Sequence, residues 1–129
     1  MIGYLLDTNA ALIALTAPDT LSLAARTAVL GGPNFLSVVS YWEVLLKSMK
    51  GNLRVGDPRD WWREALEQLA ATPLPLLPTH IAAVYSLPPI HKDPFDRVLI
   101  AQAALEDLEL VTTDGEISRY ASASFRVVA

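Results

Sequence analysis

Short apolar runs alternate along this chain with longer segments in which apolar residues recur every three or four positions. A short apolar run is typical of a buried strand, and the longer spacing is typical of a helix with one buried face. The runs that predict strands are residues 2–6, 35–38, 74–77, 109–112 and 125–128. The segments that predict helices are residues 10–15, 21–30, 40–49, 58–70, 79–86, 94–106 and 116–120. This alternation favours a three-layer α/β fold, in which helices flank a parallel sheet and Pro75 places its strand at an edge.

Two of the predicted helices begin with specific capping patterns. Residues 40–43, Ser-Tyr-Trp-Glu, predict a capping box in which Ser40 caps the helix and Glu43 reaches back to the cap. Asp93 and Pro94 predict an N-cap followed by a first-turn proline. The helix that Asp93 caps is apolar on nearly all sides, so we expect it to be buried.

Composition limits the class of protein. With 129 residues, 52% of them hydrophobic, and a mean hydropathy of +0.31, residues 1–129 are expected to form a single domain. The absence of cysteine excludes disulfides and thiolate zinc sites. No apolar stretch is long enough to span a bilayer, and the N-terminus lacks a basic leader. We therefore expect a soluble, unprocessed protein of the cytoplasm that does not act at a membrane.

The net charge of −4 and the pI near 5.0 have the wrong sign for a protein that holds nucleic acid by bulk electrostatics. A polyanionic ligand would need a bound divalent cation or a local cluster of basic residues. Lys47, Lys50 and Arg54 form such a cluster and could guide a phosphate backbone. Alternatively, Lys47 forms an ion pair with Glu43 four residues earlier, and the two interpretations are compatible.

Acidic residues fall where predicted strands end and helices begin. The four acids in such positions are Asp7, Glu43, Asp96 and Asp114. In an open parallel sheet, ligands bind beyond the carboxyl ends of the strands, so these side chains are expected to converge as a catalytic and metal-binding site. Mutual repulsion would protonate some of them unless one or two Mg²⁺ or Mn²⁺ ions kept them ionised. Oxygen-only ligation indicates a hard metal rather than zinc.

Each acid also has a purely structural interpretation. Glu43 could serve only the capping box, Asp96 could favour its helix dipole, and Asp114 before a glycine could be a turn residue. Asp7 is the hardest to explain in this way, because Thr8 could cap the following helix as well. The joint placement of all four favours a shared site.

Polar residues beside the acids could orient carboxylates or metal-bound water, although capping and turn formation are also expected of them. These candidates for a supporting layer are Thr8, Asn9, Asp93, Thr112 and Thr113.

Four segments together resemble the PIN-domain ribonucleases, and among them the VapC-like toxins of bacterial toxin–antitoxin pairs. The segments are residues 5–9, 40–51, 93–103 and 110–120, which carry the four acids in the order of the family. The resemblance implies a Mg²⁺- or Mn²⁺-dependent endoribonuclease with a PIN-like fold, whose acidic site is Asp7, Glu43, Asp96 and Asp114. It also implies a homodimer that is inhibited by a small cognate antitoxin. A helix with adjacent Trp61 and Trp62, more apolar than one domain can cover, would fit such a partner.

Two other classes of function compete with this interpretation. A Mg²⁺-dependent phosphatase of the haloacid-dehalogenase type would also place an aspartate after its first strand, but it needs a second aspartate where this chain has Asn9. A non-catalytic PIN-like module could bind RNA or protein without cleaving anything. Complete retention of four acids favours catalysis over the binding module.

Overall fold

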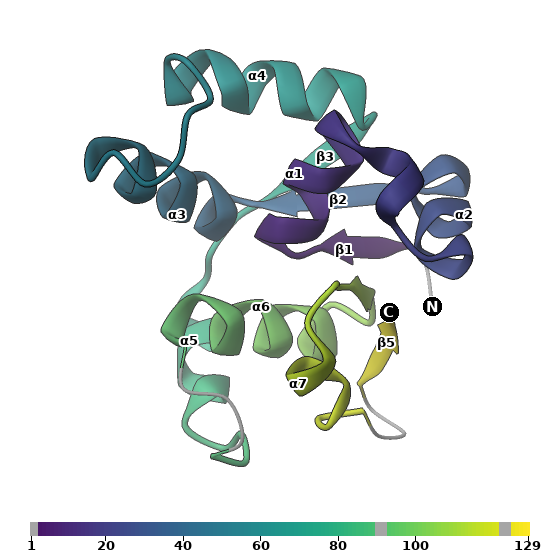
Figure 1. The fold of residues 1–129 in the computed structure, drawn as a ribbon. Helices are drawn as coiled ribbons and strands as arrows, with labels where there is room; N and C mark the ends of the chain where they lie inside the picture. The colour runs from purple at the N-terminus through teal and green to yellow at the C-terminus, as the bar shows by residue number, and fades with distance from the viewer. Residues whose placement is uncertain (1–2, 90–92, 122–124) are drawn as a thin grey trace.

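The chain folds around a five-stranded parallel sheet, seen in a computed structural model that describes residues 3–89, 93–121 and 125–129 (Figure 1). The strands are β1 (Tyr4–Leu6), β2 (Asn34–Ser37), β3 (Ala71–Leu74), β4 (Glu109–Val111) and β5 (Arg126–Val128). Their order across the sheet is β3-β2-β1-β4-β5, and every neighbouring pair is parallel. The expected parallel α/β fold is therefore confirmed, and β1 lies at its centre.

Helices cover both faces of this sheet, as the crossover connections of parallel strands require (Figure 1). Their bounds are α1 (Thr8–Thr16), α2 (Leu23–Gly31), α3 (Val38–Met49), α4 (Pro58–Gln68), α5 (Pro78–Val84), α6 (Pro94–Leu105) and α7 (Gly115–Ser118). A 3₁₀ turn, η1 (Pro18–Thr20), joins α1 to α2. None of the helices in the described part of the chain is long and apolar enough to cross a membrane.

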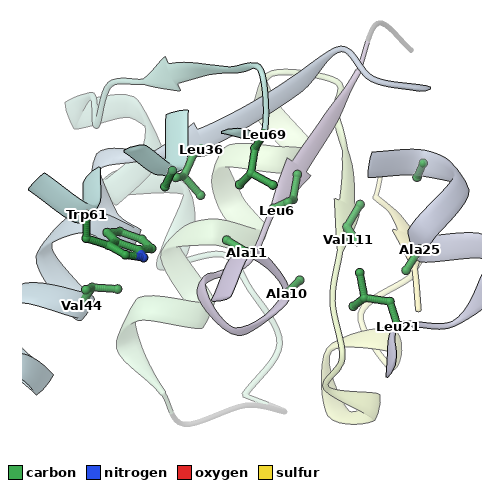
Figure 2. Packing of buried hydrophobic residues seen from close by; sticks show 12 residues of the cluster. Leu6, Ala10, Ala11, Leu21, Ala25, Leu36, Val44, Trp61, Leu69 and Val111 are labelled. Atoms are coloured by element: carbon green, nitrogen blue, oxygen red, sulfur yellow. The ribbon is translucent and has the colours of Figure 1, made fainter. Parts of the chain in front are cut away.

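Alternation along β1 divides the core into two layers. Leu6 packs with Leu36 and Val111 against α1, α2 and α4, as Figure 2 shows. Leu5 points to the opposite face and packs in the cluster that α6 and α7 cover. Because successive strand residues face opposite sides, each strand of the centre contributes to both layers. Because both faces of the central strands are buried, their sequences are continuous apolar runs rather than alternating apolar and polar residues.

The start of α3 differs from the sequence expectation. The helix begins at Val38, and the Ser37 hydroxyl caps it by accepting a hydrogen bond from the Val39 amide at 3.0 Å. The capping box at Ser40 is therefore wrong, because Ser40 and Glu43 lie within the helix. Two valines at its start resemble strand residues, which hides the true boundary in the sequence.

Two further element boundaries differ from those predicted from the sequence. Helix α1 begins at Thr8 rather than at residue 10, and Asp7, the single residue between β1 and α1, is its N-cap. Strand β3 is Ala71–Leu74 rather than residues 74–77, although its expected position at a sheet edge is confirmed. The division into elements was correct, and the errors are shifts of a few residues. The expectation of a single domain over residues 1–129 stays a prediction.

The tryptophans also differ from expectation. Trp61 is 8% exposed and belongs to the core, and the ring of Trp62 stacks on Tyr41 with centroids 4.9 Å apart. The argument for surplus apolar surface at this pair is therefore wrong. The exposed tryptophan is Trp42, at 55%, whose ring meets Phe95 edge to face.

A buried histidine ties α5 to α6. His80 is fully buried, its Nδ1 accepts from the Leu77 amide at 3.0 Å, and its Nε2 lies 2.8 Å from Glu106 Oε2. Because Nδ1 accepts, Nε2 carries the proton and donates to the carboxylate. Gln102 of α6 adds a hydrogen bond to the Pro75 carbonyl at 3.2 Å. This network fixes the direction of α6, whose first turn carries Asp96.

Gly3 allows the central strand to approach its neighbour. A Cβ atom at Gly3 would lie 2.7 Å from the Pro33 carbonyl oxygen and 2.9 Å from the Phe35 ring. We expect Gly3→Ala to lower the free energy of unfolding by about 1–3 kcal/mol, because backbone and ring would have to move. Unfolding in denaturant measures this change in the free energy of unfolding. Gly31→Ala is the matched control: it meets no atom within 4 Å, so it should be neutral or slightly stabilising. Equal midpoints for the two variants would contradict the account.

Candidate active site

A cavity of about 180 Å³ opens at the carboxyl end of β1 and is bordered by α1, α3, the start of α6 and the segment after β4. It is lined by Asp7, Thr8, Asn9, Leu12, Glu43, Lys47, Asp93, Asp96, Thr113 and Asp114. The structure thus brings together the four acids that the sequence singles out, from positions far apart in the chain. A larger cavity of about 420 Å³ beside α2 is mainly apolar and has no acid in its lining, so it offers less chemistry.

Asp7 is the most deeply placed of these carboxylates, with 3% of its surface exposed. Its Oδ1 accepts from the Ala10 amide at 2.8 Å, and its Oδ2 accepts from the Thr112 hydroxyl. Burial raises the pKa of Asp7, hydrogen bonds from Thr112 and Ala10 oppose this, and the charges of Glu43 and Asp114 raise it further. Asp7, and not Thr8, is the N-cap of α1, so it also has a structural role. A cap alone does not explain a carboxylate buried beside other acids.

Glu43 reaches the same cavity from the second turn of α3 and is 5% exposed. Its Oε1 accepts from the Thr8 hydroxyl at 2.6 Å, and its Oε2 lies 2.9 Å from Lys47 Nζ. The Thr8 hydroxyl is also hydrogen bonded to that of Ser40 at 2.9 Å. Because the helix begins at Val38, Glu43 is free from the capping role and contacts Thr8 of α1.

Thr112 connects two of the acids. Its hydroxyl donates to Asp7 and accepts from the Asp114 amide at 3.0 Å. Asp114 in turn caps α7 by accepting from the Glu116 amide at 2.9 Å. Asn9 Nδ2 donates to Thr113 Oγ1 at 3.2 Å, across the mouth of the cavity.

The N-terminus of α6 supplies the remaining acids. Asp93 caps this helix, accepting from the amides of Phe95 at 2.9 Å and Asp96 at 3.3 Å. The predicted cap with proline in the first turn is therefore confirmed. Both Asp93 and Asp96 are half-buried and line the cavity. The neighbouring Arg97 donates to the Val84 and Pro88 carbonyls, which links α6 to the end of α5.

Of the three basic residues in the predicted cluster, Lys47, Lys50 and Arg54, one lines the acidic cavity. Lys47 lines the acidic cavity and pairs with Glu43, so the i,i+4 interpretation is confirmed. The hydrogen bond that Lys47 donates to Glu43 raises the pKa of Lys47, burial opposes this increase, and the charges of Glu43, Asp93 and Asp96 add to it. Lys50 and Arg54 are exposed and do not line that cavity.

Ser40 and Leu12 take part in the site but were missed by sequence reasoning. Ser40 is fully buried and bonds to Thr8, and Leu12 forms an apolar part of the cavity wall. The signal for Ser40 was its position three residues before Glu43, which places both on one helix face once the helix starts earlier. Assigning Ser40 as the cap concealed it.

The donor set suits a hard divalent cation, because carboxylate and hydroxyl oxygens dominate the cavity, and burial together with the charges of Glu43 and Asp114 raises the pKa of Asp7. Among residues 3–89, 93–121 and 125–129, no three acids or histidines already surround one point as a finished metal cage. Both oxygens of Asp7 and of Glu43 contact protein groups, which hold these carboxylates in place. The chemistry fits a metal ion, because a carboxylate oxygen that accepts one hydrogen bond keeps a second lone pair for a cation.

Comparison with known proteins supports one family. The family model for the PIN domain matches residues 4–123. The fold is similar to that of VapBC2 from Rickettsia felis bound to a DNA fragment from their promoter, at 15% identity and a TM-score of 0.69, over 99% of this chain and 98% of that one. It is also similar to a toxin–antitoxin complex from Klebsiella pneumoniae (23%, 0.63, covering 98% and 96%) and to FitAcB from Neisseria gonorrhoeae (22%, 0.63, covering 98% and 96%). No curated protein sequence matches the chain significantly. At these identities the solved structures support the fold alone.

The burial of Asp7 predicts an unusual effect of removing its charge. Its folded pKa is raised, so the stability linked to this group is present below the unfolded pKa and is lost as pH rises through the folded pKa. Asp7→Asn keeps a capping oxygen. With EDTA present at pH 7, we expect it to raise Tm by a few degrees, the scale of about 1 kcal/mol in a chain of this size.

Thermal unfolding between pH 4 and 8 tests this expectation, and the advantage of Asp7→Asn should shrink toward pH 4. Asp19→Asn is the control, because Asp19 is exposed and outside the cavity. If Asp7→Asn is less stable than the parent throughout this range, the buried charge of Asp7 does not destabilise the fold and this explanation is wrong.

Proposed function

Because the chain belongs to the PIN domain family, we propose that it is a metal-dependent endoribonuclease, the toxin of a toxin–antitoxin pair. The observation that carries the proposal is the convergence of Asp7, Glu43, Asp96 and Asp114 on one cavity at the carboxyl edge of the sheet. Such a cluster is costly to assemble for structural reasons alone, since like charges repel in a partly dehydrated site. Its location is the usual one for ligands in open parallel sheets.

In this proposal the four acids hold Mg²⁺ or Mn²⁺, with Asp7 as the central ligand. A bound ion would supply the positive charge that activates water and stabilises the phosphodiester as it is attacked. Thr8 and Thr112 act on the acids rather than on RNA: each donates a hydrogen bond that fixes the direction of a carboxylate. Asn9, Asp93 and Thr113 complete this supporting layer at the rim of the cavity.

The RNA backbone would approach along the exposed end of α3. Lys50 and Arg54 are exposed there, beyond Lys47 at the cavity, and offset the net charge of −4 locally. Phosphate contacts of this type give binding without sequence preference. The contribution of Lys50 and Arg54 to RNA binding can be measured from the salt dependence of RNA affinity in variants of these residues.

We also propose a cognate antitoxin, a homodimer and a cytoplasmic location. Two of the proteins that share the fold were solved as toxin–antitoxin or VapBC complexes, which supports a partner for this chain. Large exposed apolar side chains provide a physical reason for association, and they include Trp42, Met49, Ile81 and Tyr85. An acidic cavity would be controlled most directly by a partner that covers it with positive charge.

Cleavage of RNA is the direct test. We expect purified protein to cut single-stranded or structured RNA with Mg²⁺ or Mn²⁺ and not with EDTA. Glu43→Gln and Asp96→Asn should each lower the rate on the order of 100-fold or more, because each removes a carboxylate that holds the cation. Glu67→Gln, on the exposed face of α4, is the charge-matched control and should cleave like the parent. Undiminished cleavage by Glu43→Gln would exclude the mechanism, and folded protein without cleavage under any metal would favour a non-catalytic PIN-like binding module.

The partner is tested by co-expression with the products of the neighbouring genes. We expect a small adjacent protein to co-purify with this chain and to suppress RNA cleavage at a one-to-one ratio or below. Size-exclusion chromatography with light scattering of the chain alone then reports whether it dimerises. If no neighbouring product binds or inhibits, the assignment as a toxin fails while the nuclease assignment is unaffected.

A further inference from the structure

Lys47 places a positive charge inside the acidic cavity. Its Nζ lies 2.9 Å from Glu43 Oε2, and it is the one basic side chain in the described lining. Five carboxylates share that lining, those of Asp7, Glu43, Asp93, Asp96 and Asp114. An ammonium group among so many acids offsets the repulsion that a divalent cation would otherwise relieve.

The two ends of the Glu43 carboxylate are held very differently. Oε1 accepts from Thr8, which is itself buried and bonded to Ser40, so this side is fixed within the fold. Oε2 is held by Lys47, whose side chain is 51% exposed on a long flexible stem. The lysine can therefore move into solvent at little cost in packing, while Thr8 keeps the carboxylate directed into the cavity.

From this arrangement we propose that Lys47 competes with the divalent cation for Glu43 Oε2 and must leave this oxygen when the metal ion is held. The proposal rests on the metal-dependent function proposed above and adds a residue that sets the metal affinity of the site. Two cations at one carboxylate oxygen repel each other, so occupancy by one disfavours the other.

The side chain at position 47 should then determine how tightly the site binds the metal ion. Lys47→Met removes the competitor but keeps an unbranched apolar stem of similar length. Lys47→Arg strengthens the competitor, because a guanidinium can hold a carboxylate through two parallel hydrogen bonds. Lys50→Met removes one positive charge from the same helix at a residue that does not line the cavity, and so controls for general charge.

Isothermal titration of EDTA-treated, dialysed protein with MnCl₂, in the absence of RNA, measures the effect. We expect Lys47→Met to bind Mn²⁺ on the order of tenfold more tightly than the parent, and Lys47→Arg to bind more weakly. Lys50→Met should stay within about twofold of the parent. Equal affinities for Lys47→Met and the parent, or equal gains for Lys47→Met and Lys50→Met, would overturn the proposal.

A second measurement uses the unaltered protein. The lysines of the chain are Lys47, Lys50 and Lys92, so their side-chain Nζ signals can be separated by NMR. The chemical shift of the Lys47 signal should change in proportion to Mg²⁺ saturation, and that of Lys50 should not. A Lys47 signal that stays unchanged when Mg²⁺ is bound would show that Lys47 does not leave Glu43. Metal that binds without this response leaves the proposed nuclease intact, whereas the absence of any metal binding removes both proposals.

Discussion

The pairing of β1 with β2 on one edge and with β4 on the other is the constraint on which the site depends. Parallel pairing aligns the carboxyl ends of these strands, and the Asp7 amide continues the ladder by donating to the Val111 carbonyl at 2.9 Å. Thr112, one residue beyond β4, is thereby held against the Asp7 carboxylate. Residues 105 positions apart meet because the sheet brings them there, and the helices that follow each strand deliver the remaining acids to the same edge.

The cost of this convergence is electrostatic, and the fold meets it with hydrogen bonds and one ion pair. Asp7 receives a backbone amide and a threonine hydroxyl, and Glu43 receives a second threonine hydroxyl and the Lys47 ammonium. Each donor lowers the cost of keeping a carboxylate ionised away from water. These same bonds direct the oxygens toward the cavity, so stabilisation of the charges and their orientation have one cause.

Sequence reasoning found the fold and the acids, because strand and helix periodicity and the position of acids after strands are local signals. It misplaced features that depend on tertiary contacts. Ser40 resembles a cap, yet Ser37 caps the helix and Ser40 packs beneath Thr8. The sequence predicted exposed apolar surface at Trp62, but the ring of Tyr41 stacks on it. Periodicity within one helix cannot predict a contact with another helix. The pairing of Lys47 with Glu43 was open to either interpretation until the cavity around it was known.

The strand order has a consequence for synthesis of the chain. The central strand is made first, but its second neighbour, β4, begins only at Glu109. The sheet edge beside Asp7 therefore stays incomplete until β4 has been synthesised, and Asp96 and Asp114 lie in the segments just before and just after β4. Such distant pairings close slowly, because the loop entropy precedes the contacts. A nascent chain consequently emerges without an assembled acidic pocket, so the order of translation itself delays whatever chemistry that pocket performs.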